Sequence, residues 1–218
     1  MLLSHKYKFL FVHVAKTGGT SVRAALNQLR WRDPKYYLTW PAHKVSGLCG
    51  HELGLKFPRH AHIIAAKEML PEPFFNDLYK FAFVRNPWDL QVSSFHHIQR
   101  ERPHAMNGIT DFNEFMRYKF DPDRPYQYHI DTSLSLQSDY VVDLHGNLLV
   151  DFVGRNEHLE DDFWKVVKHL DLPISKLPGK RIAKNRDKDY RSYYETDTID
   201  LVANHFAKDI ELFNYVYE

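Results

Sequence analysis

The segment from Lys8 to Leu29 constrains the fold of this 218-residue chain more than any other part of its sequence. Residues 8–14 are mostly apolar, β-branched or aromatic, which predicts a buried strand. A loop with two adjacent glycines follows at residues 15–21. Beyond the loop, four apolar residues recur at the spacing of one helix face: Val22, Ala25, Leu26 and Leu29. We therefore predict a strand, a glycine-containing loop and a helix in succession.

A second strand, loop and helix begin at Phe81. Residues 81–84 predict another buried strand, and Asn86 and Pro87 suit the N-cap and first position of a helix over 88–99. Apolar patterning predicts further helices over 63–70, 112–118, 159–170 and 199–213, and a hairpin over 140–153. Because strands alternate with helices, we expect a single α/β domain over residues 1–218, with a largely parallel sheet flanked by helices.

The composition excludes several classes of protein. Lys and Arg number 29 against 28 Asp and Glu, whereas a general nucleic-acid binder usually carries a strong basic excess. The single cysteine, Cys49, excludes an intramolecular disulfide framework and a cysteine-only zinc site. No apolar run is long enough for a transmembrane helix, and no signal peptide is recognisable. These features predict a soluble, cytoplasmic protein.

The loop at residues 15–21 predicts an anion site. Ligands of α/β sheets bind beyond the carboxyl ends of the strands, and a helix N-terminus there attracts phosphate. Two glycines allow close approach, and a lysine and three hydroxyl side chains add donors: Lys16, Thr17, Gly18, Gly19, Thr20 and Ser21. An ordinary turn with an N-cap is the alternative. The lysine precedes the glycines, unlike in a Walker A loop, and no aspartate offers itself for Mg²⁺, so we expect phosphate without metal.

A second anion site is expected at the end of the second strand. Arg85 lies at that strand end, and Ser93 follows two turns into the next helix. A guanidinium can bind phosphate with two hydrogen bonds, and a serine can donate to the same group. The alternatives are an ion pair of Arg85 with a nearby carboxylate and a surface role for Ser93. Together with the first loop, these residues predict two anion sites on one edge of one sheet.

Residues 11–21, Phe-Val-His-Val-Ala-Lys-Thr-Gly-Gly-Thr-Ser, resemble the 5′-phosphosulfate loop of sulfotransferases that use 3′-phosphoadenosine-5′-phosphosulfate (PAPS). Residues 81–89, with Ser93, resemble their 3′-phosphate motif. Residues 153–162 and 190–215 are similar to later segments of the family. The similarity is closest to the carbohydrate-type branch and its soluble, bacterial-like members. Leu90 stands where members often have arginine, and Asn214 where glycine is common.

The resemblance implies a P-loop-NTPase-like fold and sulfuryl transfer from PAPS to a hydroxyl acceptor, with no metal. It implies that the loop residues around Lys16 bind the 5′-phosphosulfate and that Lys16 stabilises charge on the leaving group. Arg85 and Ser93 would bind the 3′-phosphate. It further implies that Lys184, Asn185 or Arg186, in the basic stretch over residues 176–191, folds over the 3′-phosphate or adenine of the nucleotide. A solvated loop is the alternative for this stretch.

The resemblance also suggests a histidine as the general base. His60 matches the soluble relatives by spacing, and His62 matches the second histidine of the uronyl enzymes; either has a suitable ordinary pKa. Glu52 and His43 are outside candidates. A metal site built from four histidines is a further alternative: His60, His62, His96 and His97.

The acceptor is expected to be a carbohydrate or glycoconjugate. Several aromatic residues of the loops 31–60 and 96–132 could stack on sugar faces or belong to the core: Trp31, Tyr36, Tyr37, Trp40, Tyr126 and Tyr128. Two other functions are possible from the sequence, a metal-dependent P-loop kinase and a non-catalytic nucleotide-binding module. The oligomeric state is left open.

Overall fold

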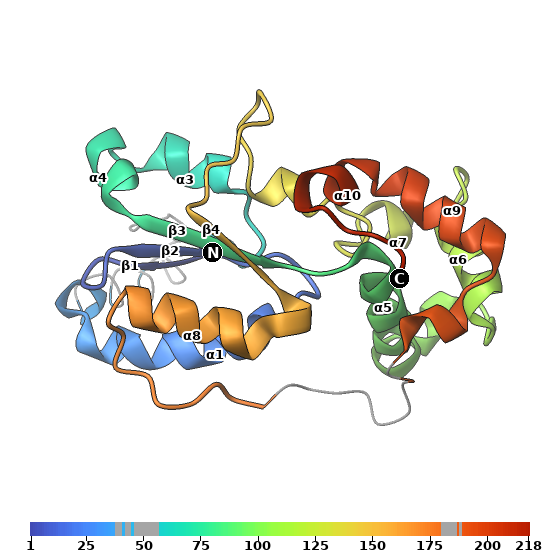
Figure 1. Cartoon of the computed structure of the whole chain (residues 1–218), viewed down its shortest axis with the longest axis horizontal. Coiled ribbons are helices and arrows are strands. Elements are labelled where there is room, and N and C mark those ends of the chain that lie inside the picture. The colour runs from blue at the N-terminus through green and yellow to red at the C-terminus, as the bar shows by residue number, and fades with distance from the viewer. Residues whose placement is uncertain (38–40, 42–44, 46–56, 180–186, 188) are drawn as a thin grey trace. The chain divides into compact units, whose positions relative to one another are not determined.

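The computed structural model describes residues 1–37, 41, 45, 57–179, 187 and 189–218 (Figure 1). The candidate residues His43, Glu52, Lys184, Asn185 and Arg186, with Trp40 and Cys49, therefore lie outside the described residues. The chain divides into two compact units. The sheet unit comprises Met1–Val14, Gly18–Val84 and Asp139–Lys180, and the helical unit comprises Ala15–Thr17, Arg85–Ser138 and Arg181–Glu218. The single domain predicted over 1–218 stays a prediction.

The sheet unit is built on four strands in the order β1-β2-β3-β4. Their bounds are Leu2–Ser4, Phe9–Val12, Tyr79–Val84 and Phe152–Arg155. β1 pairs antiparallel with β2, whereas β2–β3 and β3–β4 are parallel, with Phe11 opposite Phe81 and Phe81 opposite Phe152. Every residue of β2 is buried, as its continuous apolar run predicts for a central parallel strand. The mixed α/β architecture with helices flanking the sheet is thus confirmed.

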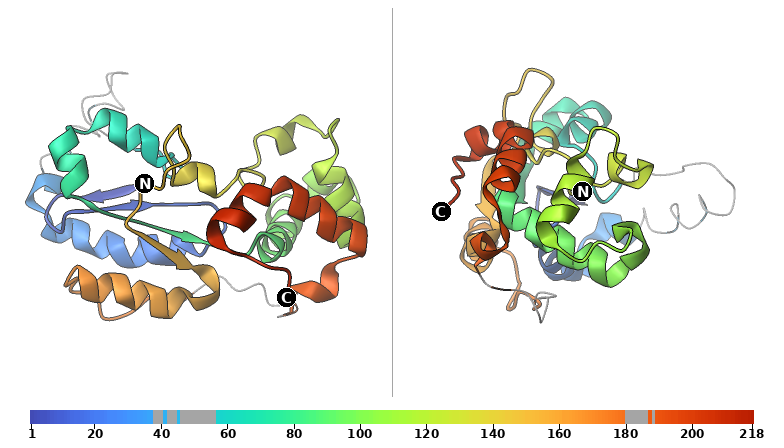
Figure 2. Two further views of the ribbon diagram at one scale, coloured as in Figure 1. Left: turned by 45° about the horizontal axis from the view of Figure 1, so that its top comes forward. Right: turned by 90° about the vertical axis from the view of Figure 1, so that its right-hand side faces the viewer.

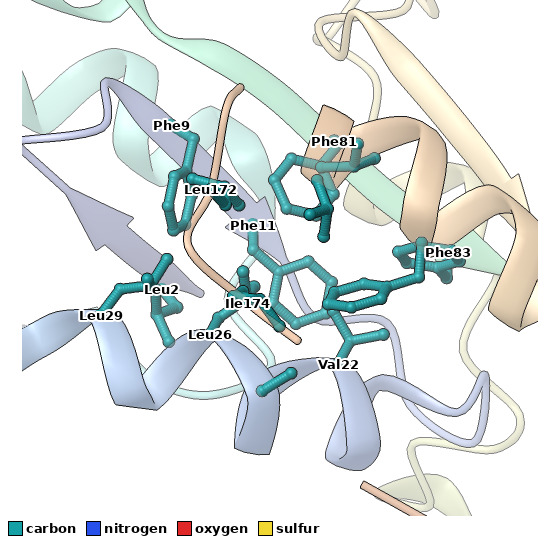
Figure 3. Close-up of a cluster of buried hydrophobic side chains, with 14 of the residues drawn as sticks. Leu2, Phe9, Phe11, Val22, Leu26, Leu29, Phe81, Phe83, Leu172 and Ile174 are labelled. Atoms are coloured by element: carbon teal, nitrogen blue, oxygen red, sulfur yellow. The ribbon is translucent and has the colours of Figure 1, made fainter. Parts of the chain in front are cut away.

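Helices cover both faces of this sheet. Helix α1 (Gly19–Asn27) and helix α8 (Leu159–His169) lie on one face, and α3 (Ile63–Met69) and α4 (Glu72–Asp77) lie on the other (Figures 1 and 2). Figure 3 shows the core on the first face. Phenylalanines from β2 and β3 meet leucine and valine side chains there: Phe9, Phe11, Phe81, Phe83, Val22 and Leu26. Burial of these apolar groups fixes α1 beneath the sheet.

The hairpin predicted over residues 140–153 differs from the structure. Val142 and Leu148 form an isolated bridge around a tight turn, and the chain then enters the central sheet as β4. The carboxylate of Asp143 accepts hydrogen bonds from the backbone amides of His145 and Asn147 and so holds the turn. Leu144 is 87% exposed, so this turn has no buried apolar face that would stabilise a longer two-stranded ladder.

The helical unit is arranged around helix α5 (Pro87–Glu101), which contacts α6 (Phe112–Phe120) and α9 (Thr196–His205). Further elements of the described chain are α7 (Tyr126–His129), α10 (Ala207–Phe213) and the short 3-10 helices η1 (Gln28–Arg32), η2 (Pro103–Met106), η3 (Ser138–Tyr140), η4 (Asn156–His158) and η5 (Tyr190–Tyr193). The last helix, predicted over 199–213, is divided between α9 and α10 at Phe206. The ring of Phe206 is fully buried against α5 residue Trp88 and Val202.

Candidate functional site

The start of α5 follows the pattern predicted for residues 86–89. Asn86 is the N-cap, and its side-chain oxygen accepts hydrogen bonds from the amides of Trp88 (3.1 Å) and Asp89 (3.5 Å). Pro87 occupies the first helical position, where a missing N–H costs nothing. The side-chain nitrogen Nδ2 of Asn86 donates a hydrogen bond to the backbone oxygen of Val216 at 3.1 Å. The capping residue therefore also holds the C-terminal segment of the helical unit.

Arg85 immediately precedes this cap, and its guanidinium is hydrogen-bonded within the protein. Its Nε donates to the carboxylate of Asp89 at 2.6 Å, which is the ion pair considered as the alternative from the sequence. Its Nη1 donates to the backbone oxygen of Lys16 at 3.1 Å. Both members of the ion pair are largely buried. The structure thus joins Arg85 to the lysine of the glycine-containing loop.

Lys16 is a half-buried cation with an unusual backbone. Its φ of 63° lies in the left-handed region, which is uncommon for a residue with a side chain and is typical of functional loops. Burial, and then the positive charges of Arg85 and Arg100, lower the pKa of Lys16 to about 8, while Asp131 opposes the shift. A cation surrounded chiefly by cations gains stabilisation from a bound anion.

The glycines of the loop open helix α1 in the sheet unit. Gly18 is the N-cap with a φ of 78°, and its carbonyl accepts a hydrogen bond from the amide of Ser21 at 3.0 Å. A Cβ at Gly18 would lie 2.5 Å from the side-chain nitrogen Nδ2 of Asn156. A Cβ at Gly19 would lie 2.3 Å from a ring carbon of His13. Neither position has room for a side chain, so the backbone comes closer to its neighbours than any other residue would allow.

The hydroxyl-bearing candidates differ in exposure. Thr17 and Ser21 are buried, Thr20 is exposed, and Ser93 is half-buried on α5. Lys16, Thr17, Arg85 and Ser93 belong to the helical unit, and Gly18 to Ser21 belong to the sheet unit. The loop is continuous in sequence between Thr17 and Gly18, and the assignment of these residues to phosphate binding stays a prediction.

His60 is held by its neighbour His13 in the sheet unit. The His60 Nδ1 lies 2.9 Å from the backbone oxygen of His13, and the ring centroids are 4.7 Å apart. A carbonyl only accepts, so Nδ1 carries the hydrogen and Nε2 of the neutral ring keeps its lone pair. Burial lowers the pKa of His60 below 6.5, against the opposing effect of the bond to His13 and with a further lowering from Arg59. His60 is therefore neutral at pH 7, and among the described residues its Nε2 has no hydrogen-bond partner.

His62 has a different setting from His60. It is exposed and occupies the N-cap position of α3, where its side chain makes no capping hydrogen bond. Its ring centroid lies 4.5 Å from that of Tyr140. The two histidines are both in the sheet unit, but the hydrogen bond to His13 is made by His60.

His13 is a residue of this site that the sequence analysis did not single out. It is 3% exposed, its ring stacks on Phe11, and the desolvation of the ring together with the charge of His60 lowers its pKa to about 3. It fills the space beside Gly19 and presents its carbonyl to His60. The signal available in the sequence was an ionisable residue at the end of an otherwise apolar strand.

Of the aromatic residues considered for sugar stacking, Tyr128 lies in the core of the helical unit and is 2% exposed. Tyr126 of the same unit is 76% exposed. In the sheet unit, the ring centroids of Trp31 and Tyr36 lie 5.6 Å apart and Tyr37 donates to the Trp31 carbonyl. Trp31 is 65% exposed, so this group presents aromatic surface to solvent.

The described residues bear on two further properties, metal binding and membrane insertion. No group of three or more His, Cys, Asp or Glu side chains in the described part of the chain is arranged to hold a metal ion. No helix among the same residues combines the length and the apolar character needed to cross a bilayer. The metal-free site and the cytoplasmic location expected from the sequence stay predictions.

The comparisons with known proteins place the chain in a family. A search of curated proteins and a search of solved structures each gave no match. A model of the sulfotransferase family matches residues 1–216. The match runs through the glycine-containing loop, Arg85 with its capped helix, and the histidine pair, and covers nearly the whole sequence. The chain therefore belongs to the sulfotransferase family.

Proposed function

We propose that this chain transfers the sulfuryl group of PAPS to a hydroxyl of a carbohydrate or glycoconjugate, on a P-loop-like fold. The observation that carries the proposal is the hydrogen bond from Arg85 Nη1 to the Lys16 carbonyl. It draws together, within the helical unit, the cations of two motifs that resemble the two phosphate-binding segments of PAPS-dependent enzymes. A donor with two separate phosphate groups suits that pair better than a single phosphate does.

The residues of the loop suit the anionic donor. Gly18 and Gly19 form the N-terminus of α1, and a helix N-terminus attracts anions. Lys16 is partly desolvated, so its charge interacts strongly with an anion. When bound, PAPS would supply an activated sulfuryl group and a good leaving group, adenosine 3′,5′-diphosphate. Lys16 would stabilise the negative charge that develops at the 5′ end, with Thr17, Thr20 and Ser21 as further donors.

His60 is the residue that we assign as general base. Its Nδ1–H is committed to the His13 carbonyl, so Nε2 is the nitrogen that accepts the proton of the attacking hydroxyl. Once protonated, the ring keeps its orientation because the Nδ1–H bond is retained. A pKa below the ordinary value also keeps His60 unprotonated at neutral pH. His62, exposed and without such a bond, is the second candidate.

The kinase alternative is supported less well by these residues. A phosphoryl transferase of the P-loop class places its lysine after the glycines, where it meets the β- and γ-phosphates, and uses carboxylates for Mg²⁺. Here the lysine precedes Gly18. A non-catalytic binding module would need no oriented base, whereas Nδ1 of His60 is fixed and Nε2 has no partner among the described residues. Sulfuryl transfer uses both the lysine that precedes the glycines and the oriented histidine base.

Ligand binding tests the donor without knowledge of the acceptor. Thermal unfolding is followed with adenosine 3′,5′-diphosphate, and with ADP in the presence and absence of Mg²⁺. At about 100 times its Kd a ligand stabilises the folded state by roughly 2.7 kcal/mol. Stabilisation by the 3′,5′-diphosphate without metal, and little by ADP, is the expected result. A preference for Mg-ADP would establish the kinase alternative, and no shift with either nucleotide would overturn the proposed donor.

Substitutions test the roles once an acceptor is found by screening glycans for mass gain from PAPS. Lys16→Met should lower the rate of transfer roughly 100- to 1,000-fold, as loss of one preorganised donor does. Lys208→Met, at an exposed position of the same unit, serves as the matched control. His60→Asn should remove the dependence of the rate on pH on the acid side of neutrality. If His62→Asn has this effect and His60→Asn does not, the base is His62.

A further inference from the structure

The backbone of Arg85 is held by a side chain far away in the sequence. The Gln137 side-chain oxygen accepts a hydrogen bond from the Arg85 amide at 2.8 Å, and its nitrogen donates to the Arg85 carbonyl at 2.8 Å. Arg85 directly follows the last residue of β3, and its 8% exposure means that its peptide groups need protein partners. One amide side chain satisfies both groups, as a neighbouring strand would.

Gln137 is in turn fixed by a buried carboxylate on α10. Asp209 Oδ2 accepts a hydrogen bond from the backbone N–H of Gln137, and Oδ1 accepts one from the backbone N–H of Ser138, each at 2.8 Å. Asp209 is fully buried and Gln137 is 1% exposed. A carboxylate placed against two backbone amides in a dry environment makes strong, well-directed hydrogen bonds. Asp209 on α10 thereby fixes the backbone of Gln137, from which the Gln137 side chain extends to Arg85.

The other side of Arg85 is fixed by its own helix. The guanidinium bonds to Asp89, one turn into α5, and to the carbonyl of Lys16. The backbone and the side chain of Arg85 are therefore set independently, the first through Gln137 and the second through Asp89. All of these residues lie in the helical unit.

We propose that Gln137 and Asp209 are positioning residues that align Arg85 for the 3′-phosphate of the donor, with Asp209 acting through Gln137. The inference rests on the proposed function, in which Arg85 binds that phosphate. Neither residue needs to touch the ligand. An arginine makes two simultaneous hydrogen bonds to phosphate within narrow angular limits, so a small shift of its Cα costs affinity for that group. Affinity for the rest of the nucleotide does not depend on this alignment.

The experiment measures the preference for the 3′-phosphate, defined as the Kd of 5′-AMP divided by the Kd of adenosine 3′,5′-diphosphate, by calorimetry on the full chain. Gln137→Met removes both hydrogen bonds to Arg85 at similar volume, and should lower this preference by about ten-fold or more. Gln137→Glu keeps the acceptor and loses the donor, and should also lower it. Asp209→Asn should have the same effect in a smaller degree, since one acceptor oxygen remains.

Two comparisons separate positioning from general loss of stability. Val202→Ala truncates a fully buried side chain of α9 in the same unit. It should lower the melting temperature and leave the preference unchanged. In an Arg85→Ala background, Gln137→Met should cause no further loss of preference, because its effect passes through Arg85. An equal loss in both backgrounds, or an unchanged preference in Gln137→Met and Gln137→Glu, would overturn the inference while leaving the proposed function intact. A wild-type chain with no preference for the 3′-phosphate would overturn both.

Discussion

Gly19→Ala is a single-atom perturbation whose effect follows from the packing of His13. The new Cβ would lie 2.3 Å from a carbon and 2.4 Å from Nε2 of that ring, whereas ordinary contact begins at 3.4 Å. The ring would have to move by about 1.1 Å, and it is buried between Phe11 and His60. Such overpacking typically costs about 1–3 kcal/mol.

A smaller effect acts in the opposite direction. Alanine restricts the unfolded chain and favours helix, which stabilises a protein by about 0.4–1 kcal/mol at positions whose backbone conformation suits it. The steric cost outweighs this gain over most of its range, so Gly19→Ala should destabilise the chain by up to about 2.6 kcal/mol. For a chain of this size, each kcal/mol lowers Tm by about 2–4 °C. Calorimetry and urea unfolding both measure the change.

The matched control is Gly179→Ala. Gly179 is exposed, and a Cβ there would meet no atom within 4 Å. Its melting temperature should stay near that of the wild type. The decisive variant adds His13→Ala, which empties the space that the Cβ needs. In that background Gly19→Ala should be neutral or stabilising, giving a coupling energy of about 0.5–3 kcal/mol between the two sites. If the two changes are additive, His13 is not what demands glycine at position 19.

Three further predictions concern charged groups. Because the pKa of Lys16 is about 8, affinity for adenosine 3′,5′-diphosphate should be constant from pH 6.5 to 7.5 and decline as the pH rises through 8; Lys16→Met should abolish this decline. The lowered pKa of His60 should place the midpoint of the acid limb of kcat/KM below 6.5, while the decline on the alkaline side belongs to Lys16; an acid-limb midpoint above 7 would contradict the role of His60 as base. Lys119 is fully buried, forms an ion pair with Asp131 at 3.3 Å and donates a hydrogen bond to Ser133 at 2.7 Å. Lys119→Met should therefore cost about 3–5 kcal/mol in urea unfolding, far more than Arg117→Ala at an exposed ion-pair site; equal costs would refute the reasoning.

Local patterns in the sequence were enough to predict the elements that carry the site. The apolar run before Lys16 became β2, and the capping signal of Asn86 and Pro87 became the start of α5. Each depends on residues adjacent in the chain, whose backbone preferences act within one or two turns. The same is true of the glycines, whose conformations follow from the absence of a Cβ.

The partners of these residues could not be predicted in the same way. Gln137 is bonded to Arg85 across 52 positions, and an isolated glutamine carries no sign of such a partner. The ion pair of Arg85 with Asp89 was open as an alternative, since i and i+4 residues meet on a helix, but which partner wins depends on burial. A hairpin was predicted over residues 140–153, yet the strand after its turn pairs with β3 because the sheet offers a larger apolar surface than a hairpin does.

The parallel pairing of the sheet has a consequence for how the protein is made. β1 and β2 are close in sequence and can associate early, but the other edge of β2 pairs with β3, where Phe9 meets Tyr79. A similar length of chain separates β3 from β4, which pair with Phe81 opposite Phe152. At a synthesis rate of roughly 5–20 residues per second, the Phe-Leu-Phe-Val strand of β2 stays open for several seconds on each new chain. Because such non-local closure is slow and leaves a strand edge unpaired, we expect the nascent chain to bind chaperones and its yield to depend on the rate of translation.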